Sequence, residues 1–200
     1  MSASLVGSEM CIRDTYPTFI EARRQFILSQ IVSLSIKEEL DEWTEGISIK
    51  WPNDIYWNEK KICGILIEND LSGHHIGRSI SGIGVNINQE TFRSDAPNPV
   101  SLKQITGQEH ERYLILANIM RRLKEYYILL QTDSSGNAAN CIAERYARSL
   151  FRREGFHRYA DADGEFLARL LCVEPDGRFI LEDQAGKVRG YLFKEVQYIL

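Results

Sequence analysis

The first regular pattern along the chain has the period of a helix. Between Thr18 and Trp43 the apolar residues recur three or four positions apart, and they include Ile27, Ile31, Leu34, Ile36 and Leu40. Pro17 stands where a helix can begin, and Gly46 stands where one can end. The pattern predicts one long amphipathic helix over residues 18–43.

After this helix the pattern changes to that of strands. Residues 47–51 alternate between apolar and polar positions and stop at the turn Pro52-Asn53-Asp54. Further strand-like runs cover residues 55–57, 61–69 and 79–88. Because the connections are short, these strands are expected to form an antiparallel meander, with the preceding helix covering one face.

The second half of the chain predicts two helices followed by a small barrel. Helical spacing covers residues 109–131 and 137–151, after a loop over residues 89–108. From residue 155 onward, short alternating runs are separated by Gly- and Asp-containing turns, a pattern typical of about five short strands in a small barrel. A domain boundary is therefore predicted near Gly155.

Composition and charge narrow the class of protein. The 200 residues are 44% hydrophobic and 26% charged, and the net charge of −4 weighs against a nucleic-acid-binding surface. No apolar run approaches the ~20 residues that cross a bilayer, and no basic segment followed by an apolar one marks a signal peptide. We expect a cytoplasmic protein with no membrane partner and, for this chain, no nucleic-acid partner.

The cysteines and the adjacent histidines do not form a metal-binding pattern. Cys11, Cys63, Cys141 and Cys172 are far apart and form no CxxC, which favours reduced and mostly buried thiols over a disulfide or metal role. The pair His74–His75 lies in a polar stretch, and neighbouring strand residues point to opposite faces. A solvated turn is expected there, and no metal ligands are assigned.

Glycines inside two of the predicted strands carry the first functional signal. Gly64 interrupts an otherwise apolar strand, and such a glycine marks a bulge or the close approach of a ligand. Gly82 and Gly84 repeat the pattern, with Asn86 and Asn88 expected on the same face. Together they predict a groove with a floor of bare backbone.

Charged residues flank this predicted floor. Lys50 ends one strand and Lys61 begins another after Lys60, while Asp54 lies in the intervening turn. A lysine about 4 Å from a phosphate oxygen gains roughly 4 kcal/mol in a shielded cleft, against about 1 kcal/mol in open water. Asp54 could orient a lysine or help hold Mg²⁺. The residues alone indicate an α/β protein whose groove favours small anions.

Three motifs give a resemblance to a known family. The stretches KWPND at residues 50–54, KICGILIE at 61–68 and GIGVNIN at 82–88 resemble biotin–protein ligases in their order and spacing. The resemblance runs from about Tyr16 to the C-terminus. It implies an α/β (α+β) fold: a class II synthetase-like catalytic domain with a mixed or antiparallel sheet and covering helices, followed by a small SH3-like β-barrel. The catalytic part is expected over residues 15–154 and the barrel over 155–200.

The family resemblance also implies an activity. Members join biotin to ATP, which gives biotinyl-AMP and pyrophosphate, and then transfer biotin to a lysine of a biotin carboxyl carrier protein. ATP and Mg²⁺ are the expected cofactors, the carrier domain of a carboxylase is the expected partner, and a homodimer is possible. Because a carboxylate must approach a polyphosphate, lysine and Mg²⁺ offset the repulsion between like charges.

Roles for individual residues follow from the same resemblance. Lys61 matches the lysine that contacts both biotin carboxylate and phosphate, and it is the expected catalytic residue. The expected biotin- and nucleotide-binding residues are Lys50, Asn53 and Asp54 at the nucleotide end, Gly64, Ile65 and Gly84 along the strands, Asn86 near adenosine, and Lys194 in the barrel.

The N-terminus departs from the family pattern. Nothing here matches the Gly- and Arg-rich loop that family members fold over biotin, and a common sequencing adapter encodes residues 9–14 when it is translated in frame. Our hypothesis is that residues 1–14 are non-native and precede a truncated catalytic domain. An adenylate without the loop would be open to water, so little or no ligase activity is expected of this chain.

Other functions stay open. A lipoate or octanoate ligase or transferase shares the catalytic architecture, but the KWPND turn and the following barrel speak against it. A non-catalytic module that binds the biotin carrier is the alternative from a different class. Many family members also carry an N-terminal DNA-binding helix-turn-helix, and no such segment is found here.

Overall fold

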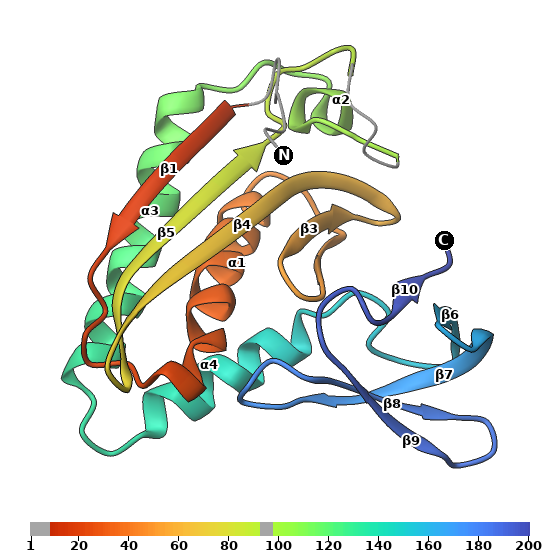
Figure 1. Cartoon of the computed structure of the whole chain (residues 1–200). Coiled ribbons are helices and arrows are strands. Elements are labelled where there is room, and N and C mark those ends of the chain that lie inside the picture. The colour runs from red at the N-terminus through yellow and green to blue at the C-terminus, as the bar shows by residue number, and fades with distance from the viewer. Residues whose placement is uncertain (1–8, 93–97) are drawn as a thin grey trace.

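The structure, a computed structural model, describes residues 9–92 and 98–200. Its larger part is a five-stranded antiparallel sheet in the order β1-β5-β4-β3-β2 (Figure 1). The strands are β1 (Glu9–Thr15), β2 (Ile47–Lys50), β3 (Asp54–Trp57), β4 (Lys60–Ser72) and β5 (His75–Val85). Strands β2 to β5 pair in sequence order, so the predicted meander is confirmed.

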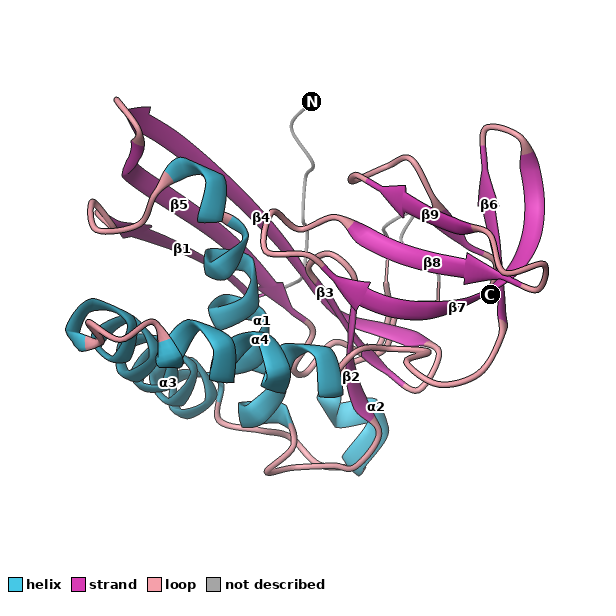
Figure 2. Ribbon diagram, turned by 90° about the horizontal axis from the view of Figure 1, so that it is seen from below, coloured by secondary structure: helices cyan, strands magenta, loops and turns pink. Residues whose placement is uncertain are grey.

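Helices cover one face of this sheet, as Figure 2 shows. They are α1 (Phe26–Leu40), α3 (Arg112–Thr132) and α4 (Asn137–Arg148). Helix α1 lies between the sheet and the other helices and is buried on most sides, including at Ile31, Leu34 and Ile36. None of these three helices lies on the opposite face of the sheet, where the groove was predicted.

Helix α1 is shorter than the predicted helix over residues 18–43. The residues before it bond to the β4–β5 hairpin: Ile20 O accepts from Ile76 N at 3.0 Å, and Ala22 N donates to His74 O at 2.9 Å. Only a short 3₁₀ turn, η1 (Ala22–Arg24), forms there. Tertiary hydrogen bonds therefore replace the helical ones that the periodicity predicted.

The predicted loop over residues 89–108 contains a short helix, α2 (Leu102–Thr106). Ser101 and Gln104 form a capping box at its start, and Gly107 ends it with a φ of 75°. Residues 93–97 of that loop lie outside the described part of the chain. The capping signal was present in the sequence, but five helical residues are too few to show a hydrophobic period.

Strand β1 is the edge strand next to β5, with a register from Glu9 opposite Val85 to Thr15 opposite Ser79. The Arg78 guanidinium bonds the Asp14 carboxylate at 2.8 Å. Residues 9–14 thus join the sheet, although no strand was predicted there. Their proposed non-native origin stays a hypothesis, and residues 1–8 lie outside the described part of the chain.

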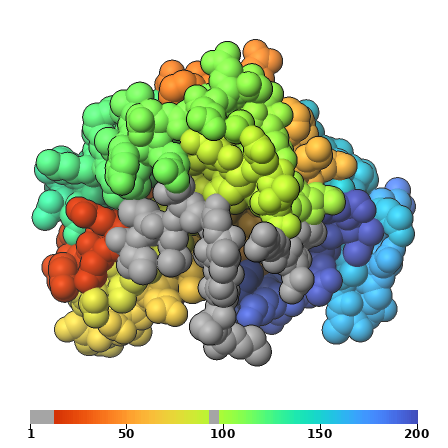
Figure 3. Space-filling view, turned by 90° about the horizontal axis from the view of Figure 1, so that it is seen from above, coloured from red at the N-terminus to blue at the C-terminus, as the bar shows by residue number. Residues whose placement is uncertain are grey.

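The C-terminal part is a second antiparallel sheet in the order β10-β6-β7-β8-β9. Its strands are β6 (His157–Asp161), β7 (Gly164–Val173), β8 (Phe179–Asp183), β9 (Val188–Tyr191) and β10 (Gln197–Tyr198). Tyr159, Phe179 and Leu181 fill its core. The predicted small barrel thus corresponds to a five-stranded domain, and in Figure 3 its blue atoms lie beside the orange segment that carries β3.

The expectation of mostly buried cysteines is wrong for two of the three cysteines whose side chains are described. Cys63 is buried between the sheet and the helices, and burial raises the pKa of its thiol. Cys141 and Cys172 are exposed. Each lies on the outward side of an amphipathic element, which apolar neighbours in sequence do not reveal. The side chain of Cys11 lies outside the described part of the chain.

Candidate functional site

Strands β4 and β5 carry glycines at neighbouring positions on the face of the sheet that the helices do not cover, so the backbone there has no side chains above it. Gly64 of β4 lies opposite Gly84 of β5, and Gly82 lies opposite Leu66. Residues that are paired across antiparallel strands share a face, and this face alternates with the buried one that contains Cys63. The predicted floor of backbone is therefore present.

Lys61 and Asp54 meet beside this floor. The Lys61 ammonium bonds an oxygen of the Asp54 carboxylate at 2.7 Å, and the two side chains are 24% and 27% exposed. A Cβ at Gly64 would lie 3.2 Å from Lys61 Cε and 3.3 Å from its Nζ. The missing side chain of Gly64 thus gives the lysine room to lie across the strand.

The turn before Asp54 is held from several sides. The Asn53 amide nitrogen donates to Ile65 O at 2.6 Å, and Tyr146 Oη donates to Pro52 O at 2.8 Å. Trp51 is buried. Asn53 therefore fixes the turn against β4 and places Asp54 next to Lys61.

Lys50 points toward aromatic side chains. Its ammonium lies 3.1 Å from Tyr56 Oη and 4.8 and 5.1 Å from the ring centres of Tyr56 and Tyr198. Burial lowers the pKa of Lys50, and the Lys61 and Arg152 cations lower it further, while Asp54 opposes them. The cation is thus shielded and within electrostatic reach of the Lys61–Asp54 pair.

Asn86 and Asn88 bind backbone groups. The Asn86 amide nitrogen donates to Val100 O at 3.2 Å and to Lys61 O at 3.5 Å. Asn88 exchanges two hydrogen bonds with the backbone of His110, at 2.9 and 3.0 Å. Both asparagines follow the end of β5 and connect it to the next segment, so their amides contribute to the frame of the site.

The side chain of Ile65 does not face the predicted groove. It is 7% exposed and packs in the helix-covered core, while its carbonyl accepts from Asn53, so its predicted role in ligand binding is left to its backbone. The open face instead presents Leu66, which is 63% exposed. Strict alternation from Gly64 would have identified Leu66, because residues two apart on a strand share a face.

Lys194 lies in the turn between β9 and β10 of the second sheet. It adopts a φ of 73°, is exposed, and its ammonium lies 5.4 Å from the Phe193 ring centre. It lines an open pocket of about 610 Å³ within the barrel, together with Asp161 and Tyr191. None of the other predicted site residues lines that pocket.

Metal ligands are sparse near this site. Within residues 9–92 and 98–200, no group of three or more His, Cys, Asp or Glu side chains could hold a metal ion. Asp54 is the single carboxylate among the predicted site residues. Mg²⁺ at nucleotide sites is held by one or two carboxylates together with substrate phosphates, so Asp54 fits as a ligand for a phosphate-bound ion.

Together these residues form a cationic corner beside an open, partly apolar floor. Lys61 and Lys50 supply positive charge against one carboxylate, and Leu66 with the bare glycines supplies the floor. This arrangement suits a ligand with an apolar body and an anionic end.

Among the described residues, no helix has the length and apolarity that crossing a membrane requires.

Comparison with protein families and relatives gives a consistent result. Residues 9–86 match the model of the biotin/lipoate A/B protein ligase family. The bifunctional ligase/repressor BirA of Bacillus spizizenii is 30% identical over 148 residues, which cover 72% of this chain and 44% of that protein. The biotin–[acetyl-CoA-carboxylase] ligase of Paracoccus denitrificans is 31% identical over 153 residues, which cover 70% of this chain and 59% of that protein.

The family match begins at residue 9, before the expected start of the resemblance at Tyr16, and it includes strand β1. All three motifs start within the matched range, and Lys61 lies well inside it. The chain spans about half the length of the Bacillus relatives that it matches.

Solved structures show the same fold. The biotin protein ligase of Aquifex aeolicus superposes with a TM-score of 0.76 at 24% identity, over 96% of this chain and 83% of that chain. A structure of that ligase in complex with biotin and ATP gives a TM-score of 0.75 at 24% identity, over 96% of this chain and 79% of that one. The predicted fold class, including the small C-terminal β domain, is confirmed.

Proposed function

We propose that this chain, which matches the model of the biotin/lipoate A/B protein ligase family over residues 9–86, is a biotin ligase that activates biotin with ATP and passes it to a carrier protein. The acceptor is a lysine of a biotin carboxyl carrier domain. The relative from Paracoccus denitrificans is named for this type of reaction. The cytoplasm, where ATP and the carboxylases meet, is the proposed location.

The proposed reaction has two steps. First, a carboxylate oxygen of biotin bonds to the α-phosphorus of ATP, the bond from that phosphorus to the bridging oxygen breaks, and pyrophosphate leaves. Second, the amine of the acceptor lysine bonds to the carbonyl carbon of biotinyl-AMP, AMP leaves, and the amine loses a proton. Mg²⁺, when bound to the phosphates, neutralises part of their charge.

The observation that carries this proposal is the position of the Lys61 ammonium. Asp54 holds it at 2.7 Å, beside Gly64 and at the end of the bare floor. There it can stabilise both the attacking carboxylate and the negative charge that grows on the phosphate in the transition state. Lys50, shielded by Tyr56, adds positive potential behind it.

The floor supports binding of the rest of biotin. Gly64, Gly82 and Gly84 allow a ligand to approach the backbone closely, and Leu66 offers apolar contact. Asn86 and Lys194 are kept as proposed contacts to the adenosine part. For Asn86 the support is weaker than the resemblance implied, because its amide nitrogen already bonds Val100 O. Self-association into a homodimer also stays a proposal.

The test is a biotinylation assay. The chain is incubated with biotin, MgATP and a biotin carboxyl carrier domain, and both pyrophosphate release and the mass of the carrier are measured. Because the sequence leads us to expect low ligase activity of this chain, we expect slow pyrophosphate release and a low yield of biotinylated carrier, with a further loss of at least ~100-fold for Lys61→Ala. Lys60→Ala is the matched control, since Lys60 is the exposed neighbour and is expected to keep the activity.

The alternatives predict other outcomes of this assay. Incorporation of lipoate in place of biotin would identify a lipoate ligase. Calorimetric binding of the carrier with no pyrophosphate release would identify a carrier-binding module. Equal activity of wild type and Lys61→Ala would refute the role of Lys61.

A further inference from the structure

A turn of the barrel reaches the start of the segment that carries Asp54. The Trp51 indole nitrogen donates to Gly177 O at 3.0 Å, in the turn between β7 and β8. The same indole stacks on Phe179, with ring centres 4.8 Å apart and 19° between the planes. Trp51 is buried, so the barrel holds this side chain both by its edge and by its face.

The acceptor carbonyl is itself fixed by close packing. Gly177 has a φ of 93°, and a Cβ there would lie 2.6 Å from Cδ2 of Phe26 in α1. Glycine allows both the positive φ and the close approach to the ring. Phe26 also meets Tyr146 edge-on at 5.6 Å, and Tyr146 donates to Pro52 O at 2.8 Å. Phe26 of α1 thus packs against the Gly177 turn of the barrel, and Tyr146 of α4 bonds the turn that contains Pro52.

Only two residues, Pro52 and Asn53, separate Trp51 from Asp54. In between, the Asn53 amide bonds Ile65 O at 2.6 Å, and Asp54 then bonds the Lys61 ammonium at 2.7 Å. Hydrogen bonds hold each of residues 51–54, so a shift of Trp51 is expected to displace Asp54 as well. The orientation of Trp51 and the position of the Lys61 ammonium are therefore linked.

We propose that Trp51 and Gly177 are positioning residues through which the C-terminal barrel sets the orientation of Asp54 and, through it, of Lys61. The consequence for ATP rests on the proposed function. The coupling from the barrel to the Lys61–Asp54 pair is a geometric statement that can be tested without any ligand.

The key variant is Trp51→Phe, which keeps a ring for the stack on Phe179 but removes the N–H that bonds Gly177. Its matched control is Trp57→Phe. Trp57 lies on β3 and donates its indole N–H to Glu45 O at 3.0 Å, within the catalytic part. Both variants lose one indole-to-carbonyl bond, but only the first bond joins the two domains.

The readout is the acylation rate of Lys61 relative to that of Lys60, measured on the full chain by mass spectrometry with an amine-reactive acylating reagent. Lys60 is exposed and serves as the internal reference. We expect the ratio to rise about fivefold in Trp51→Phe, as the loss of one hydrogen bond allows, and to stay unchanged in Trp57→Phe. Gly177→Ala, which displaces the turn from Phe26, is expected to raise it as well.

A merely structural role for Trp51 predicts a different result. The unfolding temperature would fall while the Lys61/Lys60 ratio, measured well below that temperature, stayed at the wild-type value in Trp51→Phe and Gly177→Ala. That outcome overturns the inference.

A titration with MgATP separates the inference from the proposed function. We expect the wild type to bind and Trp51→Phe to bind about fivefold more weakly. If the wild type does not bind ATP, the proposed function fails, while the acylation ratio still decides whether the barrel positions Lys61.

Discussion

The Lys61 ammonium owes its position to two neighbours of opposite character. The Asp54 carboxylate attracts it, and the absent side chain of Gly64 leaves space for it. Because the pair is only partly buried, its contribution to stability is small, about 1 kcal/mol or less. The pair therefore matters for where the charge lies far more than for how stable the fold is.

Replacing Gly64 tests this view at the scale of one methyl group. Gly64→Ala places a Cβ against Lys61 Cε and Nζ, at 3.2 and 3.3 Å, and the flexible lysine must move. We expect an unfolding free energy within ~1 kcal/mol of wild type but a fall in adenylation of about tenfold or more. Pyrophosphate release and urea denaturation measure the two quantities. Unchanged adenylation would contradict the proposed position of the ammonium.

His110 gives the fold a dependence on pH. Its ring lies 2.6 Å from Thr106 Oγ1 and edge-on to Trp43, and burial lowers its pKa below the usual 6.5. Below that pH the unfolded chain binds more protons at this residue than the folded chain does, so the free energy of unfolding falls as the pH drops.

The measurement is the urea midpoint at about pH 7.5 and about pH 5.5. We expect His110→Gln to lose part of the decrease that wild type shows. His74→Gln, at the exposed tip of the β4–β5 hairpin, serves as the control and should keep the full decrease. An identical pH dependence in all three proteins would exclude His110 as its source.

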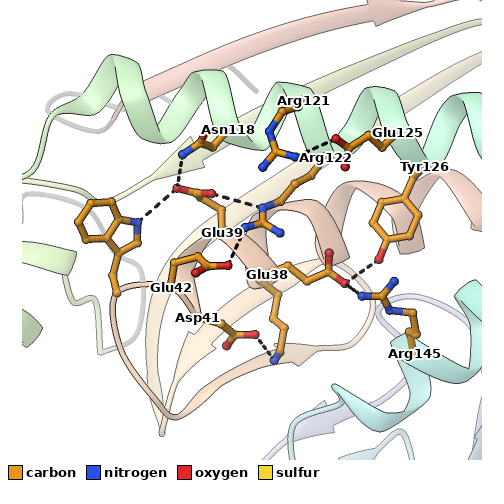
Figure 4. A network of polar contacts seen from close by, with 12 residues as sticks. Glu38, Glu39, Asp41, Glu42, Asn118, Arg121, Arg122, Glu125, Tyr126 and Arg145 are labelled. Carbon is orange, nitrogen blue, oxygen red and sulfur yellow. Dashed lines mark hydrogen bonds and ion pairs between the residues drawn. The ribbon is translucent and has the colours of Figure 1, made fainter.

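At the scale of elements, a polar network joins α1 to α3 and α4 (Figure 4). Glu39 of α1 is 1% exposed and accepts from Trp43, Asn118 and Arg122 at 3.1 to 3.3 Å. Glu38, one residue earlier, bonds Tyr126 at 2.6 Å and Arg145 at 2.7 Å. These contacts fix the helices relative to one another and, through α1, relative to the sheet.

Because the Glu39 carboxylate is buried and that of Glu125 is exposed, we expect alanine variants of the two to differ in their free energy of unfolding. Glu39→Ala leaves the donors on Trp43 and on α3 without their acceptor, and we expect a loss of about 3 kcal/mol. Glu125→Ala removes an exposed partner of Arg121 at 2.8 Å on the same helix, and we expect a change below about 0.5 kcal/mol. Denaturant unfolding measures both. Similar losses for the two variants would show that Glu39 is not a special anchor.

At the scale of the whole molecule, aromatic rings join the part that contains the first sheet to the C-terminal β domain. The ring centre of Phe151 lies 5.5 Å from that of Tyr56 and 5.9 Å from that of Tyr198. Arg152 donates to Ile199 O at 2.8 Å and pairs with Glu59 at 3.4 Å. With the Trp51–Phe179 stack, these contacts form a continuous interface, so we expect the two parts to unfold together.

Phe179→Ala tests this cooperativity. The ring is fully buried, and its loss should cost about 3–5 kcal/mol. We expect a single transition that shifts to lower temperature equally in far-UV and near-UV circular dichroism. Leu167→Ala, on the exposed side of the barrel, is the control with little effect. A separate early transition of the barrel would show that the interface does not couple the parts.

The sequence by itself determined the local elements and the chemistry of the motifs. The meander, the two later helices and the small C-terminal β domain followed from hydrophobic period and turn residues, which act over a few neighbouring positions. The motif residues Lys61, Asp54 and Gly64 were also identified from sequence, because strand ends and an interrupting glycine are local features.

Only the tertiary structure decided where α1 begins, that Ile65 is buried while Leu66 is exposed, and that residues 9–15 pair with β5. It also decided that the barrel grips Trp51 through Gly177, 126 positions away in the sequence. The physical reason is the same in each case. Hydrogen bonds and packing between distant segments outweigh local preferences, and a single sequence carries no record of which distant segments meet.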